Sequence, residues 1–147
     1  MVEENARKHW MSLLAKAEPQ DLAGLWADVP GKPEFTYLRA PEVGGVMVRG
    51  RAGATGAPFN LGEMTVTRCS VQLSGGAVGH AYVQGRDKTH ATQAAVIDAL
   101  MQTDCADRLR ERVLEPLRDT QEQARTARAA KAAATKVDFF TMVRGDD

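Results

Sequence analysis

One stretch near the middle of the chain passes from a strand pattern to a helix pattern within a few residues. Residues 77–84 alternate apolar and polar side chains, which is typical of a strand with one buried face. Gly85 interrupts the alternation, and Asp87, a preferred N-cap residue, precedes a helical pattern. The apolar residues that share one face of this helix are Ala94, Ile97, Leu100 and Met101. This order predicts a strand, a tight turn and a helix that packs on a sheet.

Further strand patterns surround this stretch. Including it, the segments with strand character are 34–39, 43–51, 59–73 and 77–84. Ser74-Gly75-Gly76 fits a hairpin turn, and consecutive strands joined by short turns favour antiparallel pairing. Amphipathic helices are expected at 6–17, from Pro19 onward and at 108–117. We therefore expect an α+β fold, with an antiparallel sheet of about four strands flanked by N-terminal and C-terminal helices.

The composition changes after Leu117. From 118 to 136 alanine dominates, basic residues are interspersed, and no large apolar side chain occurs before Val137. Helix propensity is high in this segment, but such a helix has few groups with which to hold itself to a core. We expect a core domain over 1–117 and an extended helical arm with an apolar docking tail over 118–147.

The tail at 137–147 holds two of the four phenylalanines of the chain. A terminus that only meets water usually frays and has no use for a Phe-Phe pair, so we prefer contact with a partner protein over packing on the chain itself. For the arm at 118–136, a solvated helix, or one that packs closely through its alanines, is the alternative. The residues expected at the partner interface are Arg125, Arg128, Phe139, Phe140, Met142, Val143 and Arg144.

The overall charge and the cysteines exclude several classes of function. Lys and Arg together number 19, as do Asp and Glu, so the formal net charge is zero, which argues against nucleic-acid binding. Cys69 and Cys105 form no metal-ligand spacing, and no metal site is expected. No run approaches the length of a membrane span, and the polar N-terminus is unlike a secretory signal. We expect a cytoplasmic protein with no membrane contact.

Polar residues gather at the turn before the central helix, and we treat them as a candidate anion site. The residues are Gly85, Arg86, Asp87, Lys88 and His90. Unpaired N–H groups at a helix start attract anions, and Arg and Lys reinforce the attraction. Singly, each residue has a plainer role, as an N-cap, a solvated cation or a histidine at the edge of the core. No nucleophile, carboxylate pair or metal set accompanies them, so anion binding is favoured and no catalytic residue is assigned.

Three sequence blocks carry a resemblance that the local patterns do not explain. They are His9-Trp10-Met11-Ser12; Val83-Gln84-Gly85-Arg86-Asp87-Lys88 with His90-Ala91 and Ile97-Asp98-Ala99-Leu100-Met101; and Val137-Asp138-Phe139-Phe140-Thr141-Met142-Val143-Arg144-Gly145-Asp146. Residues 51–56, Leu73 and Gly79 fit the same pattern. Over nearly its whole length the chain resembles the PhnG family, whose members are subunits of the bacterial carbon–phosphorus lyase core complex that degrades phosphonates.

The resemblance implies a cytoplasmic assembly with the subunits PhnH, PhnI and PhnJ and, transiently, the ATPase-like PhnL. It implies a part in the ATP-dependent reaction in which a phosphonate displaces adenine from ribose, forming ribose 1-methylphosphonate 5-triphosphate when methylphosphonate is the substrate. PhnI is generally taken as the catalyst of that step, and PhnJ carries an iron–sulfur cluster. No cofactor is implied for a PhnG protein alone, and no catalytic residue is established in that family.

Three functional hypotheses follow. The first is an accessory subunit with a mainly structural role, which completes the synthase assembly by binding PhnI and is not catalytic alone. The second is a subunit whose Arg86, Lys88 and His90 bind the phosphonate or the triphosphate. The third is a free-standing binding module, for instance one that binds nucleic acid through 118–136, which the neutral charge disfavours.

Overall fold

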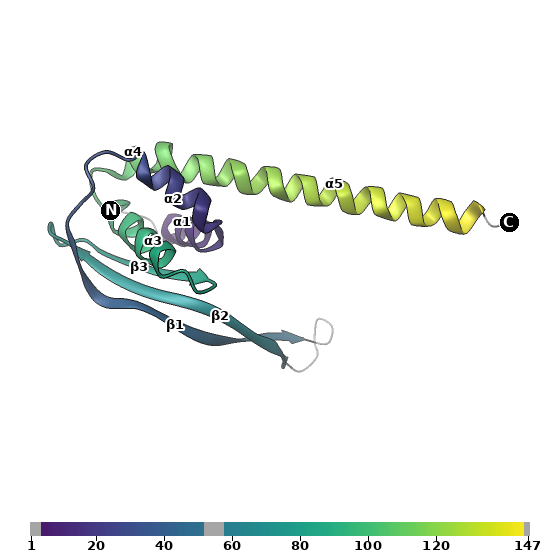
Figure 1. The fold of residues 1–147 in the computed structure, drawn as a ribbon, viewed down its shortest axis with the longest axis horizontal. Coiled ribbons are helices and arrows are strands. Elements are labelled where there is room, and N and C mark those ends of the chain that lie inside the picture. The colour runs from purple at the N-terminus through teal and green to yellow at the C-terminus, as the bar shows by residue number, and fades with distance from the viewer. Residues whose placement is uncertain (1–3, 52–57, 146–147) are drawn as a thin grey trace.

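The structure, a computed structural model, describes residues 4–51 and 58–145, without the side chains at 49, 51, 58–61 and 137–145. Its elements are α1 (Glu4–Lys16), α2 (Pro19–Ala27), β1 (Phe35–Arg51), β2 (Pro58–Leu73), β3 (Val78–Gln84), α3 (Lys88–Leu100), α4 (Ala106–Leu109), a π-helical turn (Arg110–Leu114) and α5 (Glu115–Gly145), as Figure 1 shows. The expected α+β class is confirmed. Most of the glycine-rich segment at 51–56 lies outside the described residues.

Three antiparallel strands form the sheet, in the order β1-β2-β3. The expected number of about four was too high, because the two strand segments anticipated before residue 52 belong to the single strand β1. Its pairing with β2 shifts register between Tyr37 and Arg39 and again between Arg39 and Glu42. A proline has no N–H to donate and is tolerated at such bulges. Pro41 therefore lies in an irregularity of β1 and does not end the strand.

Helix α3 packs on one face of the sheet. The buried strand residues on that face include Cys69, Val71, Ala81 and Val83. Helix and sheet approach closely at Gly79, where a Cβ atom would overlap the carbonyl oxygen of Ala95 and crowd the backbone nitrogen of Ala99. Only glycine permits this approach, which gives a packing reason for Gly79.

The central helix has the buried face that its sequence predicts. The expected apolar stripe is buried throughout: Ala94, Ile97, Leu100 and Met101. Helix α2 packs on α3, whereas α1 packs against both α3 and the edge strand β3, with Leu14 and Leu22 almost fully buried. The core therefore lies between one face of the sheet and the helices α1, α2 and α3.

Asp98 is a fully buried carboxylate in α3. Its Oδ1 accepts hydrogen bonds from Arg7 Nε at 3.2 Å and from Trp10 Nε1 at 2.7 Å. Its Oδ2 accepts from Arg7 Nη2 at 2.9 Å and from the backbone N–H of His80, also at 2.9 Å. The hydrogen bond to Asp98 raises the pKa of Arg7. These donors from α1 and β3 compensate a charge that would otherwise be costly to bury, and we call the group the Asp98 junction.

Helix α5 leaves the core soon after it begins. Leu109, Val113, Leu114 and Leu117 are buried, and the π-helical turn joins α4 to α5 without a break in the helical path. From residue 118 to 136 every side chain is exposed except that of Gln121, which is partly buried. Figure 1 shows α5 extending far beyond the sheet and the other helices. In the part of the chain described, no helix is both long and apolar enough to cross a membrane.

Candidate functional site

The turn before α3 has the geometry that the sequence predicts. Gly85 adopts a φ of 95°, a left-handed conformation that favours glycine. Its N–H donates to the carbonyl of Thr65 at 2.9 Å, and its own carbonyl accepts from Thr67 Oγ1 at 2.8 Å. Asp87 caps the helix, because its Oδ1 accepts from the backbone N–H of His90 at 2.9 Å. Strand, turn and cap are therefore held together by local hydrogen bonds.

The predicted anion-site residues do not converge on one point. His90 is only 1% exposed, and its Nε2 lies 2.8 Å from the carbonyl oxygen of Leu14. Because a carbonyl can only accept, Nε2 carries the proton and ties α3 to the end of α1. Arg86 and Lys88 are exposed, and neither side chain has an ion pair or hydrogen bond to any described residue. The backbone carbonyl of Lys88 accepts from Thr92 Oγ1 at 3.1 Å within the helix. The imidazole therefore has a structural contact, while the two cations face solvent.

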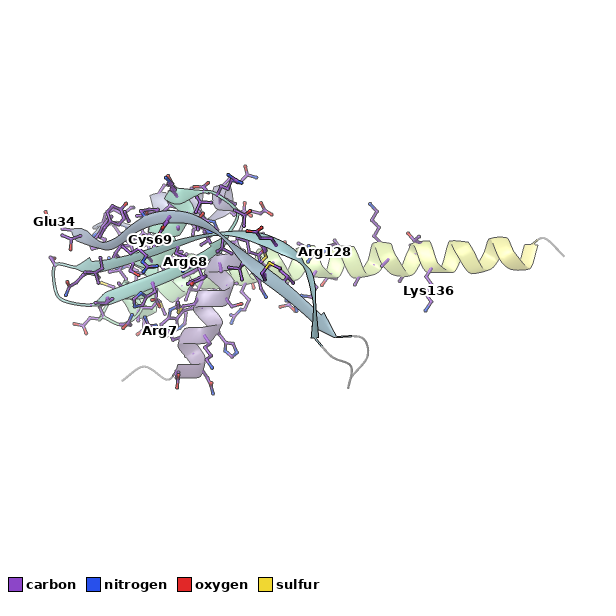
Figure 2. The ribbon with its side chains drawn as sticks, turned by 90° about the horizontal axis from the view of Figure 1, so that it is seen from below. Arg7, Glu34, Arg68, Cys69, Arg128 and Lys136 are labelled. Atoms are coloured by element: carbon purple, nitrogen blue, oxygen red, sulfur yellow. The ribbon has the colours of Figure 1, made fainter. Side chains whose placement is uncertain are left out.

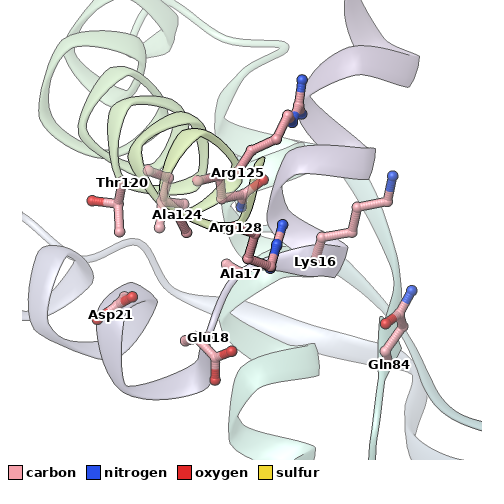
Figure 3. Close-up of a pocket in the computed structure, with 11 residues that line it drawn as sticks. Lys16, Ala17, Glu18, Asp21, Gln84, Thr120, Ala124, Arg125 and Arg128 are labelled. Atoms are coloured by element: carbon pink, nitrogen blue, oxygen red, sulfur yellow. The ribbon is translucent and has the colours of Figure 1, made fainter. Parts of the chain in front are cut away.

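A different set of charged residues surrounds a pocket of about 420 Å³ at the base of α5. The pocket lies where the end of α1, the start of α2, the end of β3 and α5 meet, as Figure 3 shows. Its lining residues are Lys16, Ala17, Glu18, Asp21, Gln84, Leu117, Thr120, Gln121, Ala124, Arg125 and Arg128. We call it the α5-base pocket. It falls in the range of volumes typical of small-molecule sites.

The charges of the α5-base pocket are separated by sign. Lys16, Arg125 and Arg128 lie along one side of the view in Figure 3, and Glu18 and Asp21 lie along the other. Among the described side chains the only ion pairs join Arg7 to Asp98 and Arg110 to Asp107. The five charged groups of the pocket thus make no ion pair with one another within 4 Å.

Secondary structure fixes the walls of the pocket. Gln121 Nε2 donates to the carbonyl of Leu13 at 3.0 Å, which fastens α5 to α1 one turn before Arg125. Leu117 and Ala17 are buried beneath the pocket, so its floor belongs to the hydrophobic core. Glu18 is the N-cap residue of α2 but makes no side-chain capping bond, which leaves its carboxylate available.

In the structure, two residues of the predicted partner interface lie at the α5-base pocket. They are Arg125 and Arg128, which line the pocket. Figure 2 shows Arg128 at the point where α5 leaves the core. The remaining members of that set, Phe139, Phe140, Met142, Val143 and Arg144, belong to helix α5, but their side chains lie outside the described ones.

Sequence reasoning did not find Lys16, Glu18 or Asp21. Their only signal is position, since they flank the junction of two N-terminal helices more than 90 residues before Arg125. Gln84 belongs to one of the three sequence blocks but is not one of the predicted site residues. As for metals, no group of three or more His, Cys, Asp or Glu residues in the described part of the chain is arranged to hold an ion.

Comparisons with known proteins agree with the resemblance noted in the sequence. Residues 5–145 match the family described as phosphonate metabolism protein PhnG. A protein of Rhizobium meliloti (strain 1021), named alpha-D-ribose 1-methylphosphonate 5-triphosphate synthase subunit PhnG, is 45% identical over 141 residues, which are 96% of this chain and 90% of that protein. Matches that extend over almost the whole chain show that it belongs to the PhnG family of phosphonate metabolism proteins.

Proposed function

We propose that this chain is an accessory subunit of a ribose 1-methylphosphonate 5-triphosphate synthase, and that its main role is to hold the assembly together through α5. The observation that carries the proposal is the long exposed helix. Between 118 and 136 only Gln121 is partly buried, and α5 extends away from the core (Figure 1). Family membership supplies the setting, since the relative is named as a subunit of an alpha-D-ribose 1-methylphosphonate 5-triphosphate synthase.

The physical chemistry of α5 favours a partner. Most helical stability in proteins comes from packing of one face, and a solvated helix depends on propensity alone. Alanine supplies that propensity, and its small side chain allows another backbone to approach closely. From 129 to 136, beyond the α5-base pocket, the helix carries two cations and no carboxylate. These features suit a protein partner with an acidic groove that covers this part of α5.

Within this proposal the assembly contains PhnI, PhnH and PhnJ and, transiently, PhnL, in the cytoplasm. The assembly transfers the ribose triphosphate group of ATP onto a phosphonate with release of adenine, and PhnI supplies the catalytic residues. The iron–sulfur cluster belongs to PhnJ. This chain contributes contacts and binds no cofactor of its own.

Removal of the tail tests the proposal. Deletion of residues 137–147 in a strain that expresses the whole complex should abolish or strongly reduce co-purification of the partner subunits, because the apolar part of the arm is lost. A matched variant, Phe139→Ala with Phe140→Ala, keeps the length of α5 and should weaken assembly in the same direction. Circular dichroism of the truncated chain serves as the control for folding. Full assembly with full adenine release by both variants would overturn the proposal.

A further inference from the structure

We infer that the α5-base pocket binds a phosphorylated sugar, with the phosphate groups on its cationic side and the sugar hydroxyls on its acidic side. The inference rests on the proposed function and deepens it, because it gives the chain direct contact with the ribose triphosphate that the name of the relative contains. It also moves the substrate contact away from the turn at 85–90, where the sequence placed it.

The cationic side has the chemistry that a polyphosphate needs. Lys16 comes from the last turn of α1, and Arg125 and Arg128 lie almost one turn apart on α5. A guanidinium can bind phosphate oxygens in a bidentate way, and a lysine adds a mobile point charge. Because none of the three is within 4 Å of a described carboxylate, an incoming anion breaks no ion pair.

The acidic side argues against a bare anion as the ligand. Glu18 and Asp21 repel any anion that fills the whole pocket, so inorganic phosphate or tripolyphosphate gains only part of the available attraction. Carboxylates are good acceptors for the hydroxyl groups of a ribose, the role they have in dinucleotide-binding folds. The amide of Gln84 adds a donor and an acceptor at the rim. A ligand with phosphates at one end and hydroxyls at the other satisfies both sides.

The pocket is built before any ligand arrives. Its floor is the buried pair Leu117 and Ala17, and Gln121 fastens α5 to α1. A preformed site binds its ligand with little loss of conformational entropy, because its side chains and backbone are already ordered. The turn at 85–90 is not preformed in this way. Arg86 and Lys88 face solvent, and His90 Nε2 hydrogen-bonds to the carbonyl oxygen of Leu14.

The test compares two ligands that differ only in hydroxyl groups. Isothermal titration of the full chain with ATP and with 2′,3′-dideoxy-ATP, in magnesium-free buffer, should show ATP binding at least threefold more tightly. Arg125→Gln with Arg128→Gln should weaken both ligands at least tenfold. Lys131→Gln, which removes one charge from the same helix outside the pocket, should change either affinity by less than twofold. Thermal melting establishes that each variant is folded.

The acidic side has its own test. Glu18→Gln with Asp21→Asn should abolish the preference for ATP and should tighten the dideoxy ligand, since repulsion is removed and no hydroxyl contact is lost. Three results would each overturn the inference: equal affinity for the two ligands in the unmodified chain, a Lys131 variant that weakens binding as much as the Arg125 and Arg128 double variant does, or no saturable binding.

Co-purification of the same variants separates this inference from the proposed assembly role. The Arg125 and Arg128 variant should assemble with its partners at the level of the unmodified chain, whereas the tail deletion should not. If the variant fails to assemble but retains nucleotide binding, the two arginines are partner contacts and the inference is wrong.

Discussion

The Asp98 junction and the α5-base pocket both join helix α1 to distant parts of the chain, but they treat charge in opposite ways. At the junction one carboxylate accepts four hydrogen bonds and is fully buried. In the pocket, by contrast, five charged groups stand without an ion pair among the described side chains. A buried charge with all its hydrogen-bond partners in place stabilises a fold, because removal of any partner leaves a buried group unpaired. Charged groups without an ion pair contribute little to the free energy of unfolding and are available to bind a ligand.

Replacement of the junction carboxylate should have the largest effect. Asp98→Ala leaves Arg7, the indole N–H of Trp10 and the backbone N–H of His80 without their acceptor. Loss of one member of a buried ion pair typically costs about 3–5 kcal/mol, so we expect a loss of that order in the free energy of unfolding, measured by urea denaturation. Asp107→Ala is the matched control. Its carboxylate also pairs with an arginine but is 97% exposed, and a change above about 1 kcal/mol there would contradict the argument from burial.

A smaller change at the same place should have an intermediate effect. Trp10→Phe keeps most of the ring volume but removes the hydrogen bond of 2.7 Å from Nε1 to Asp98. Hydrogen bonds to charged groups contribute about 1.5–3 kcal/mol, and we expect a loss in that range by the same denaturation measurement. Trp26→Phe is the comparison, because Trp26 is partly exposed and makes no hydrogen bond to Asp98. Equal losses for the two tryptophan variants would show that ring packing, and not the hydrogen bond, determines the effect.

The pocket charges should matter least for stability. Lys16→Gln and Arg128→Gln each remove a cation that has no described ion pair, and substitutions of that kind usually change the free energy of unfolding by less than about 0.5 kcal/mol. Thermal melting at low and high salt measures the effect. A destabilisation comparable to that of Trp10→Phe would mean that these cations are part of the structural framework, as Arg7 is.

Adenine release by the assembled complex separates the pocket from the turn at 85–90. Arg128→Gln should reduce the rate about tenfold, the equivalent of about 1.4 kcal/mol in transition-state binding. Arg86→Gln, a substitution of the same type at a solvated cation, should leave the rate within about twofold, or less than about 0.5 kcal/mol in transition-state binding. The reason is that Arg86 is exposed and does not line the pocket. The hypothesis that Arg86, Lys88 and His90 bind the substrate predicts the reverse order of the two effects.

The features that the sequence predicts well depend on residues that lie within about twenty positions of one another. The turn at Gly85, the cap by Asp87 and the burial of His90 all follow from local conformation and helical spacing. The strand count failed for a local reason too, since Pro41 could mark either an end or a bulge, and only the pairing with β2 decides between them.

Contacts between residues that are far apart in the sequence could not be predicted from the sequence. The bond from Trp10 to Asp98 spans 88 residues, and the pocket joins Lys16 to Arg128 across more than a hundred. Trp10 and Asp98 each stood in a block that resembles the family, yet periodicity gave no reason to pair them. Such pairs depend on how α1 packs against α3 and against the start of α5, which is a property of the packed structure and not of any one segment.

Hydrogen exchange read by mass spectrometry tests the central claim most directly, namely that α5 is the surface that assembles with a partner. In the free chain, amides of α5 beyond Leu117 should exchange much faster than those of α3, because the described side chains there are exposed and the helix has little tertiary packing. In the assembled complex those amides should become strongly protected, while α3 changes little. Equal exchange of α5 in the free chain and in the complex would contradict the account.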